Sequence, residues 1–266
     1  MATSKRHDSP SLPEHVLVNR AHWDEYADFW VAPGQRNWAA TEPSWGCWHI
    51  PESELRLLPD DMSSMKAIEL GCGTAYVSAW MARRGAEVVG IDNSSRQLET
   101  AKRLMTEHGI DLTLLHGNAE TVPYPDESFD FAISEYGAAI WCDPNVWIPE
   151  AHRLLRPGGR LTFLGNHPFS MICIPSSGAN VDERLHTPYF GLHKLDWRYV
   201  EIDPGGIEFN LTISNWLKLF RGTGFDVVDY HELQAPPDVT ELRFAVTGEW
   251  AQRWPSEQVW ELRKRP

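Results

Sequence analysis

Short apolar runs and longer amphipathic stretches alternate through the middle of the chain. Between the runs, apolar residues recur at helical spacing over 75–84, 94–108 and 143–155, and each of these stretches predicts a helix. Alternation of this kind is typical of an α/β fold with a doubly wound, mostly parallel sheet. The apolar runs predict five strands, at 66–70, 86–91, 112–116, 129–134 and 160–164.

The pattern beyond the fifth strand is less regular. A helix near 214–221 and a strand at 225–230 continue the alternation, and we expect a further strand around 242–246 and a terminal helix from Ser256. These additions make a seven-stranded sheet. Residues 166–211 do not alternate, and their prolines and aromatics predict an insertion after strand five.

The residues ahead of the first strand divide into a polar tail and an aromatic segment. Residues 1–14 are polar with two prolines, which predicts a disordered tail. Residues 15–60 are rich in tryptophan and predict an N-terminal helical cap, with a helix over 15–30 and a loop at Pro33-Gly34. Residues 61–266 then form the main domain.

Composition narrows the range of partners. The 266 residues carry a formal net charge of −13, which repels polyphosphate, so we expect no nucleic-acid partner. No apolar run reaches eighteen residues and the first ten are polar, so neither a membrane helix nor a signal peptide is expected. The four cysteines form no Cys-x-x-Cys pair, which favours the cytoplasm and no zinc site. No spacing of ligands indicates any other metal, and the sequence predicts no oligomeric state.

The stretch Glu69-Leu70-Gly71-Cys72-Gly73-Thr74 joins the first strand to a helix through a glycine-rich turn. Such a turn brings backbone N–H groups to a ligand at the carboxyl end of a strand. The third glycine of a dinucleotide fingerprint is replaced by Tyr76, and the Gly-Lys-Ser/Thr of a phosphate loop is missing. The carboxylate of Glu69 suits a ligand with an ammonium or sulfonium charge.

With three further motifs, the chain resembles the class I S-adenosylmethionine-dependent methyltransferases, most strongly over 64–165. The motifs are Asp92 at the end of the second strand, Gly117-Asn118-Ala119-Glu120 after the third, and Arg156-Pro157-Gly158-Gly159 before the fifth. The resemblance implies a Rossmann-like sheet, S-adenosylmethionine as cofactor and, in the small-molecule branch of the family, a small methyl acceptor as the partner.

The resemblance also implies a cofactor site. Asp92 has an independent reason to bind ribose, because a carboxylate accepts hydrogen bonds from both hydroxyls of a diol. Asn118 departs from the aspartate of many relatives and lacks its charge. We expect the cofactor to be bound by Tyr26, Glu69, Gly71, Cys72, Gly73, Asp92, Asn93, Asn118, Ala119 and Ser134.

Acceptor-side residues are expected at the ends of strands four and five. His167 is the preferred general base, and the alternative is an edge histidine bonded to the backbone. Glu135 and Tyr136 are candidates for contacting the acceptor or the methionine ammonium group. His186 and His193 in the insertion are further candidates for the acceptor side.

The tryptophans of the cap have two interpretations. As structure, they form the apolar underside of a cap packed on the sheet. As function, Trp30, Trp38, Trp45 and Trp48 form the walls of a pocket for a flat acceptor and shield the sulfonium, together with Trp23 and Tyr26.

We therefore expect an enzyme that transfers a methyl group to a small, aromatic or hydrophobic metabolite, with oxygen favoured over nitrogen and carbon as the acceptor atom. The Asn/Asp-Pro-Pro-aromatic motif of base N-methylation is absent after strand four. The alternatives are methylation of protein or RNA, or a regulatory protein that binds the cofactor without transferring the methyl group.

Overall fold

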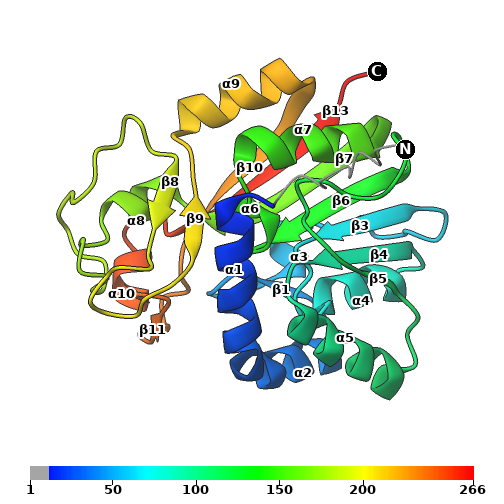
Figure 1. Cartoon of the computed structure of the whole chain (residues 1–266), viewed down its shortest axis with the longest axis horizontal. Helices are drawn as coiled ribbons and strands as arrows, with labels where there is room; N and C mark the ends of the chain where they lie inside the picture. The colour runs from blue at the N-terminus through cyan, green and yellow to red at the C-terminus, as the bar shows by residue number, and fades with distance from the viewer. Residues whose placement is uncertain (1–11) are drawn as a thin grey trace, which may run out of the picture.

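A single mixed sheet organises the chain in the computed structural model, which describes residues 12–266. The predicted tail 1–14 therefore lies largely outside the described residues. The sheet has seven strands in the order β10-β13-β7-β6-β3-β4-β5, which confirms the predicted α/β class (Figure 1). Its strands are β3 (Lys66–Leu70), β4 (Glu87–Asp92), β5 (Thr113–His116), β6 (Phe129–Glu135), β7 (Leu155–Asn166), β10 (Phe225–Leu233) and β13 (Glu257–Lys264).

The last strand corrects two sequence predictions. We predict a terminal helix from Ser256 and a sheet strand at 242–246, and both predictions are wrong. Instead, β13 runs antiparallel between β10 and β7, while the other neighbouring pairs from β7 to β5 are parallel. The helix prediction fails because Glu257 is as buried as Trp260, at 1% exposure each, so no polar and apolar alternation marks the strand.

Helices cover both faces of the sheet. On one face lie α4 (Tyr76–Arg83) and α5 (Ser95–His108), and on the other α7 (Pro144–Leu154) and α9 (Ile213–Thr223) (Figure 1). All four helices occur where the sequence predicts them. Within β3, Ala67 and Ile68 pack into two different core clusters. A strand buried on both sides explains the continuous apolar runs of the sequence.

The N-terminal cap is more helical than predicted. Helix α1 (Glu14–Glu25) continues through a 3-10 segment, η1 (Tyr26–Trp30), into α2 (Val31–Ala39). The predicted loop at Pro33-Gly34 is wrong, because Pro33 lies in the first turn of α2, where its missing N–H breaks no helical hydrogen bond. The rest of the cap contains β1 (Ser44–Trp45), β2 (Ile50–Pro51) and α3 (Glu52–Leu55).

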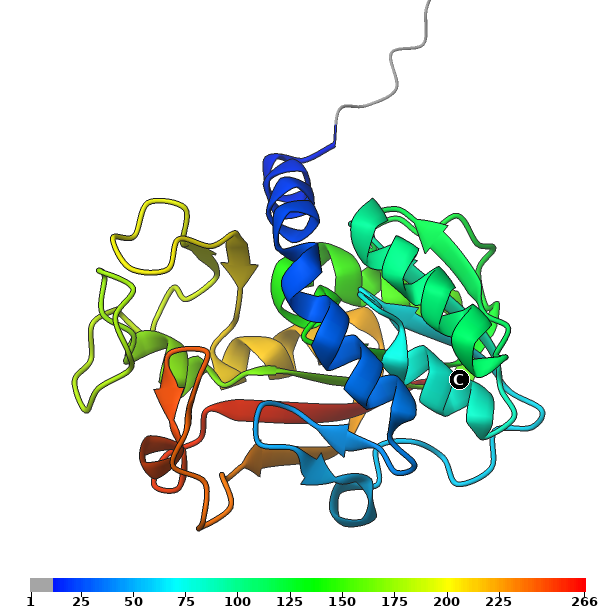
Figure 2. The same cartoon turned by 90° about the horizontal axis from the view of Figure 1, so that it is seen from below.

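A lobe at the left of both views extends the carboxyl end of the sheet (Figures 1 and 2). It is built from the insertion and from residues that precede β13. Within residues 12–266, no helix combines the length and the apolar character needed to cross a membrane. Besides α6 (Ala138–Trp141), which follows β6, the remaining elements are α8 (Pro168–Ile172), β8 (Lys194–Asp196), β9 (Ile207–Phe209), β11 (Leu242–Arg243), β12 (Val246–Thr247) and α10 (Gly248–Ala251).

Candidate active site

The turn between β3 and α4 brings three neighbouring strand ends together. Gly71 has a φ of +79°, and a Cβ at this position would lie 2.6 Å from the Cα of Gly137, which follows β6. The N–H groups of Gly71 and Cys72 both donate to the carbonyl of Ile91 in β4. Glycine is therefore required here by the backbone conformation and by the close approach of β6.

Asp92 links the same turn to the end of β4. Its Oδ2 accepts a hydrogen bond from the Gly73 N–H at 2.7 Å, and its Oδ1 accepts one from the Ser94 N–H at 2.8 Å. Burial raises the pKa of this carboxyl, and the two N–H donors partly offset that effect. Each oxygen keeps a further lone pair for a ligand.

Glu69 lies beneath the turn at 2% exposure. Its Oε2 accepts hydrogen bonds from the N–H of Ser78 at 2.8 Å and from its hydroxyl at 2.5 Å. Burial raises the pKa of Glu69 to about 8, although the Ser78 donors oppose the shift. Without a ligand the side chain is therefore largely protonated at neutral pH, and a nearby cation favours its ionised form.

A cavity of about 130 Å³ lies above this turn, at the carboxyl ends of the parallel strands. Among the described residues, those that line it include no lysine, arginine or histidine. Of the carboxyl groups that line it, Glu69 and Glu135 are buried and Asp92 is half-buried, and no lysine or arginine of residues 12–266 pairs with them, so the cavity favours a ligand with positive charge. Eleven of the predicted site residues line it: Trp30, Glu69, Gly71, Cys72, Gly73, Asp92, Asn93, Asn118, Ala119, Glu135 and Tyr136.

Glu135 and Tyr136 form a part of the wall that contacts Gly46 and Cys47 of the cap. The Oε1 of Glu135 accepts from the Gly46 N–H at 2.9 Å, and its Oε2 accepts from the Tyr76 hydroxyl at 2.5 Å. Burial raises the pKa of Glu135, and the two donors oppose that shift. The Tyr136 hydroxyl donates to Oε1 of Glu257 at 2.6 Å.

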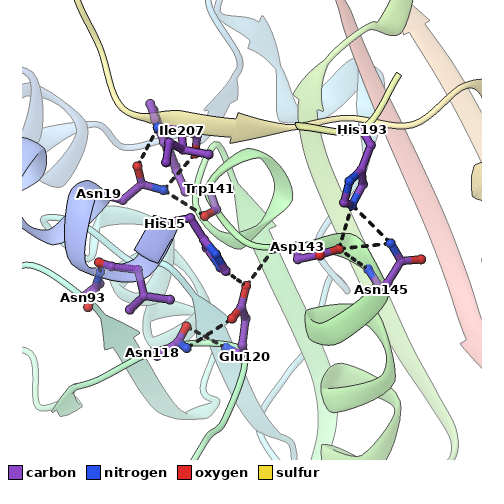
Figure 3. A network of polar contacts seen from close by, with 11 residues as sticks. His15, Asn19, Asn93, Asn118, Glu120, Trp141, Asp143, Asn145, His193 and Ile207 are labelled. Carbon is purple, nitrogen blue, oxygen red and sulfur yellow. Dashed lines mark hydrogen bonds and ion pairs between the residues drawn. The ribbon is translucent and has the colours of Figure 1, made fainter. Parts of the chain in front are cut away.

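Helix α1 lies across the cavity and is fixed there by polar side chains (Figure 3). The amide nitrogen of Asn19 donates to the carbonyls of Trp141 and Ile207, at 3.0 and 2.9 Å, and its oxygen accepts from the Ile207 N–H at 2.8 Å. Asn93 donates to the carbonyl of Val16 at 2.7 Å, which fixes the helix to the end of β4.

The loop after β5 makes a second attachment for α1 (Figure 3). Nε2 of His15 lies 2.6 Å from Oε1 of Glu120, which also accepts from the Asp143 N–H at 2.7 Å. The oxygen of Asn118 accepts from the Glu120 N–H at 3.0 Å, and its nitrogen donates to Oε2 at 3.3 Å. Asn118 is thus oriented by Glu120, two residues further along the same loop.

His167 lies outside the cavity lining and corrects the predicted general base. Its Nδ1 accepts from the Phe169 N–H at 3.1 Å and caps α8, and its Nε2 lies 3.1 Å from both the Tyr230 hydroxyl and Oε1 of Glu232. Burial lowers the pKa of His167 to about 4. The alternative of an edge histidine bonded to the backbone describes this residue.

Three of the predicted pocket tryptophans belong to the core, which corrects that expectation. The indole N–H of Trp38 donates to the Thr74 carbonyl at 2.7 Å, that of Trp45 to Glu52 at 2.7 Å, and that of Trp48 to Ser256 at 2.8 Å. All three are at most 3% exposed. The structural interpretation therefore holds for Trp38, Trp45 and Trp48, and the pocket interpretation remains for Trp30.

Two further residues predicted at the cofactor do not line the cavity. Tyr26 is 40% exposed and packs on His22, with ring centroids 4.6 Å apart. Ser134 is fully buried, donates to the Leu70 carbonyl at 2.7 Å and accepts from the Ala139 N–H at 3.1 Å. Ser134 therefore joins β6 to β3 and supports α6.

Two predicted acceptor residues in the insertion also lie elsewhere. His186 pairs with Asp182 at 2.9 Å and is exposed. His193 pairs with Asp143 at 3.0 Å and lines a separate open groove beside α7 and α9. Neither histidine lines the cavity above the glycine turn.

Several lining residues were missed by the sequence interpretation. Asn19 lies one helical turn before Trp23 on α1, and Trp23 is expected in the pocket, so the helical spacing was a usable signal for Asn19. Tyr76 and Trp141 had no such signal, because the chain reversals after β3 and β6 determine where they point.

One cluster of possible metal ligands occurs within residues 12–266. Ligand atoms of Asp229, His231 and Glu261 lie within 4.8 Å of one another on β10 and β13. Glu261 is already paired with Arg160, whose charge opposes a cation there. None of these residues lines the cavity.

The sheet order and the glycine turn at its carboxyl edge define the class: a nucleotide-type α/β fold with a site for a positively charged ligand. The sequence profile of a methyltransferase domain matches residues 68–163. A demethylmenaquinone methyltransferase of Listeria monocytogenes is 34% identical over 192 residues, which cover 66% of this chain and 76% of that protein. The chain belongs to the class I S-adenosylmethionine-dependent methyltransferases.

Two other comparisons are more partial. A rice chloroplastic 2-methyl-6-phytyl-1,4-hydroquinone methyltransferase 2 is 33% identical over 128 residues, which cover 46% of this chain. This chain spans only 36% of the length of that relative. The crystal structure of an S-adenosylmethionine-dependent methyltransferase from Mesorhizobium loti superposes with a TM-score of 0.64 at 21% identity, over 80% of this chain and 96% of that one, and shows the shared fold.

The residues present fit S-adenosylmethionine. A Cβ at Gly73 would meet no heavy atom within 4 Å, so the turn is open on that side, and Asp92 lies next to it. The carboxyl groups suit the two positive charges of the cofactor. The cavity measures about 130 Å³, and α1 and η1 contribute Val16, Asn19, Trp23 and Trp30 to its lining.

Proposed function

We propose that the protein transfers the methyl group of S-adenosylmethionine to an uncharged, flat or hydrophobic small molecule, with oxygen as the favoured acceptor atom. The observation that carries the proposal is the Gly73–Asp92 contact at the base of a cavity whose described lining has no positively charged side chain. The names of the two relatives support the acceptor class, because demethylmenaquinone and a phytyl hydroquinone are uncharged quinone-type molecules.

The cofactor side of the cavity supplies the binding groups. Asp92 would accept hydrogen bonds from the ribose diol, and Asn93, Asn118 and Ala119 would border the adenine. Glu69 would lie below the methionine portion, with the backbone of Gly71 and Gly73 against it. When bound, the cofactor supplies a methyl group that is already activated by its sulfonium. The protein therefore mainly needs to align the acceptor with this methyl group.

The acceptor side supplies that alignment and excludes water. Trp23, Trp30 and Trp141 line the cavity, and Trp30 also stacks on Phe244, in the turn between the paired strands β11 and β12, with ring centroids 5.9 Å apart. Holding two reactants in line contributes about 7–11 kcal/mol to such displacements. Indole faces also favour a nearby sulfonium by about 0.5–2 kcal/mol.

The proposal is tested with the purified chain and methyl-labelled S-adenosylmethionine. The matched acceptors are 1,4-hydroquinone and 2,5-dihydroxybenzoate, which differ by one carboxylate. We expect label in hydroquinone and little in the benzoate, because the described lining offers the carboxylate no cation. Failure to bind the cofactor in calorimetry, or preference for the benzoate, would contradict the proposal.

A further inference from the structure

Tyr136 has an unusual backbone conformation at the wall of the cavity. It follows β6 with a φ of +51°, a left-handed conformation that is costly for a residue with a side chain. Its N–H donates to the Leu164 carbonyl at 3.0 Å, so the strain is held by the neighbouring strand. Residues held in this way concentrate at functional sites.

Glu257 accepts the hydrogen bond of the Tyr136 hydroxyl. It is the first residue of β13 and is 1% exposed. Its Oε1 accepts from the Tyr136 hydroxyl at 2.6 Å and from the Cys47 N–H at 2.8 Å. Its Oε2 is buried without a hydrogen-bond partner among the described residues. Burying an ionised carboxyl with an unpartnered oxygen costs free energy, and protonation of the carboxyl removes part of that cost.

The surroundings of this pair favour exchange of a proton near neutral pH. Burial, with a contribution from the charge of Glu135, raises the pKa of Glu257 to about 7, although the donors Tyr136 and Cys47 oppose the shift. The Cys47 thiol donates to the Tyr136 oxygen at 3.4 Å, and Arg243 donates to the Cys47 carbonyl. These are the ionisable groups that face the pair from the cap loop, β6 and β11.

We propose that Tyr136 and Glu257 form a proton relay that takes the proton of an acceptor hydroxyl bound in the cavity. The proposal rests on the O-methylation proposed above. The acceptor oxygen gains the methyl carbon as the sulfur–methyl bond breaks, and its proton passes to the oxygen of Tyr136. The proton of Tyr136 moves along the 2.6 Å hydrogen bond to Oε1 of Glu257. The sulfonium loses its positive charge and the carboxylate its negative charge, so the net charge is unchanged.

The geometry favours this pair over the other candidates. His167 does not line the cavity, and its ring is fixed by Phe169 and Tyr230. Each oxygen of Glu135 accepts one hydrogen bond, from Gly46 and from Tyr76, so Glu135 has no oxygen without a partner, whereas Glu257 has one within the described part of the chain. Tyr136 borders the cavity and leads to a carboxyl that retains an oxygen without a partner, so Tyr136 is the catalytic residue and Glu257 acts through it.

The kinetic test uses two acceptors of similar size and different acidity, hydroquinone and tetrafluorohydroquinone. We expect Y136F and E257Q to bind S-adenosylmethionine like the wild type but to lose about 10²–10⁴-fold in kcat on hydroquinone. The loss should be smaller for the acidic phenol and should shrink as the pH rises, because an ionised acceptor needs no base. The matched controls Y230F and E261Q, which alter residues on β10 and β13 outside the cavity lining, should leave kcat unchanged.

The outcomes separate the relay from the proposed function. Equal losses on both phenols, with an unchanged pH profile, would overturn the relay and leave the methyltransferase activity standing. Failure of the wild type to methylate either phenol would remove O-methylation and the relay together. A second measurement needs no acceptor: the infrared spectrum should contain a protonated carboxyl band that titrates near neutral pH, is lost in E257Q and shifts in Y136F. Its absence would also overturn the relay.

Discussion

The backbone N–H of Gly73 donates to Oδ2 of Asp92 at 2.7 Å, across nineteen residues of sequence. This contact joins the end of β3 to the end of β4 at the edge of the cavity. Since Gly73 has a φ of +51° and open space beside it, the same short segment fixes the turn and leaves room for a ligand. The cofactor side of the site therefore depends on a single local arrangement.

Substitution of Asp92 tests that arrangement. We expect D92A to weaken S-adenosylmethionine binding about 10- to 100-fold, because hydrogen bonds to a charged group are worth about 1.5–3 kcal/mol. D92N, which keeps an acceptor oxygen, should lose less. Isothermal titration calorimetry measures both, with D111A at an exposed position as the control. Equal affinity of D92A and wild type would remove Asp92 from the binding site.

Truncation of Trp38 should mainly affect stability, whereas truncation of Trp30 should mainly affect activity. W38A removes a fully buried indole and should lower the free energy of unfolding by about 3–5 kcal/mol. W30A removes a partly exposed ring from the cavity wall and should mainly lower methyl transfer. Urea unfolding and turnover on hydroquinone distinguish the two effects. A stability loss in W30A as large as in W38A would contradict this division.

His167 should matter for stability and not for the chemical step. H167A removes the cap of α8 and should cost about 0.5–2 kcal/mol of unfolding free energy. H167N keeps a capping oxygen and should recover part of that loss. The pH profile of kcat should be the same in both variants as in the wild type. Loss of the acidic limb of the kcat–pH profile in these variants would indicate that His167 acts as a general base.

Glu69 should make the protein less stable as the pH rises. The folded pKa of about 8 lies above the value of 4.5 for a free side chain, so between these values the folded state binds more protons than the unfolded state. Stability from this group is therefore lost as the pH rises through that window. E69Q cannot titrate at this position. The melting temperature of E69Q relative to wild type should therefore rise between about pH 5 and about pH 8. A difference in melting temperature between E69Q and wild type that stays constant across this range would contradict the raised pKa of Glu69.

The predicted site residues that line the cavity are local in the chain. The glycine turn, Asp92 and the Asn118 loop each follow a strand directly, so a parallel sheet is enough to bring them to one edge. The helix predicted over 94–108 is equally local, because α5 begins after the Ser94 cap and ends at Gly109.

The parts that sequence did not predict depend on distant partners. Trp48 is fixed by Ser256, and His167 by Tyr230, and no local pattern reports either contact. From sequence alone, Glu257 is expected in an exposed terminal helix. In the structure it lies in β13, which pairs with β7, and it contacts Cys47 of the cap. A buried carboxyl cannot be recognised from hydrophobic periodicity, because a charged residue in the sequence is interpreted as a solvent-exposed position.

The placement of β13 has a consequence for synthesis on the ribosome. Because β13 lies between β7 and β10, the nascent chain can complete the α/β layers from β3 to β7 while the outer edge of β7 stays unpaired. An open edge of that length is exposed to pairing with other nascent chains until the last strand emerges. Molecular chaperones that shield strand edges should therefore raise the soluble yield of this protein.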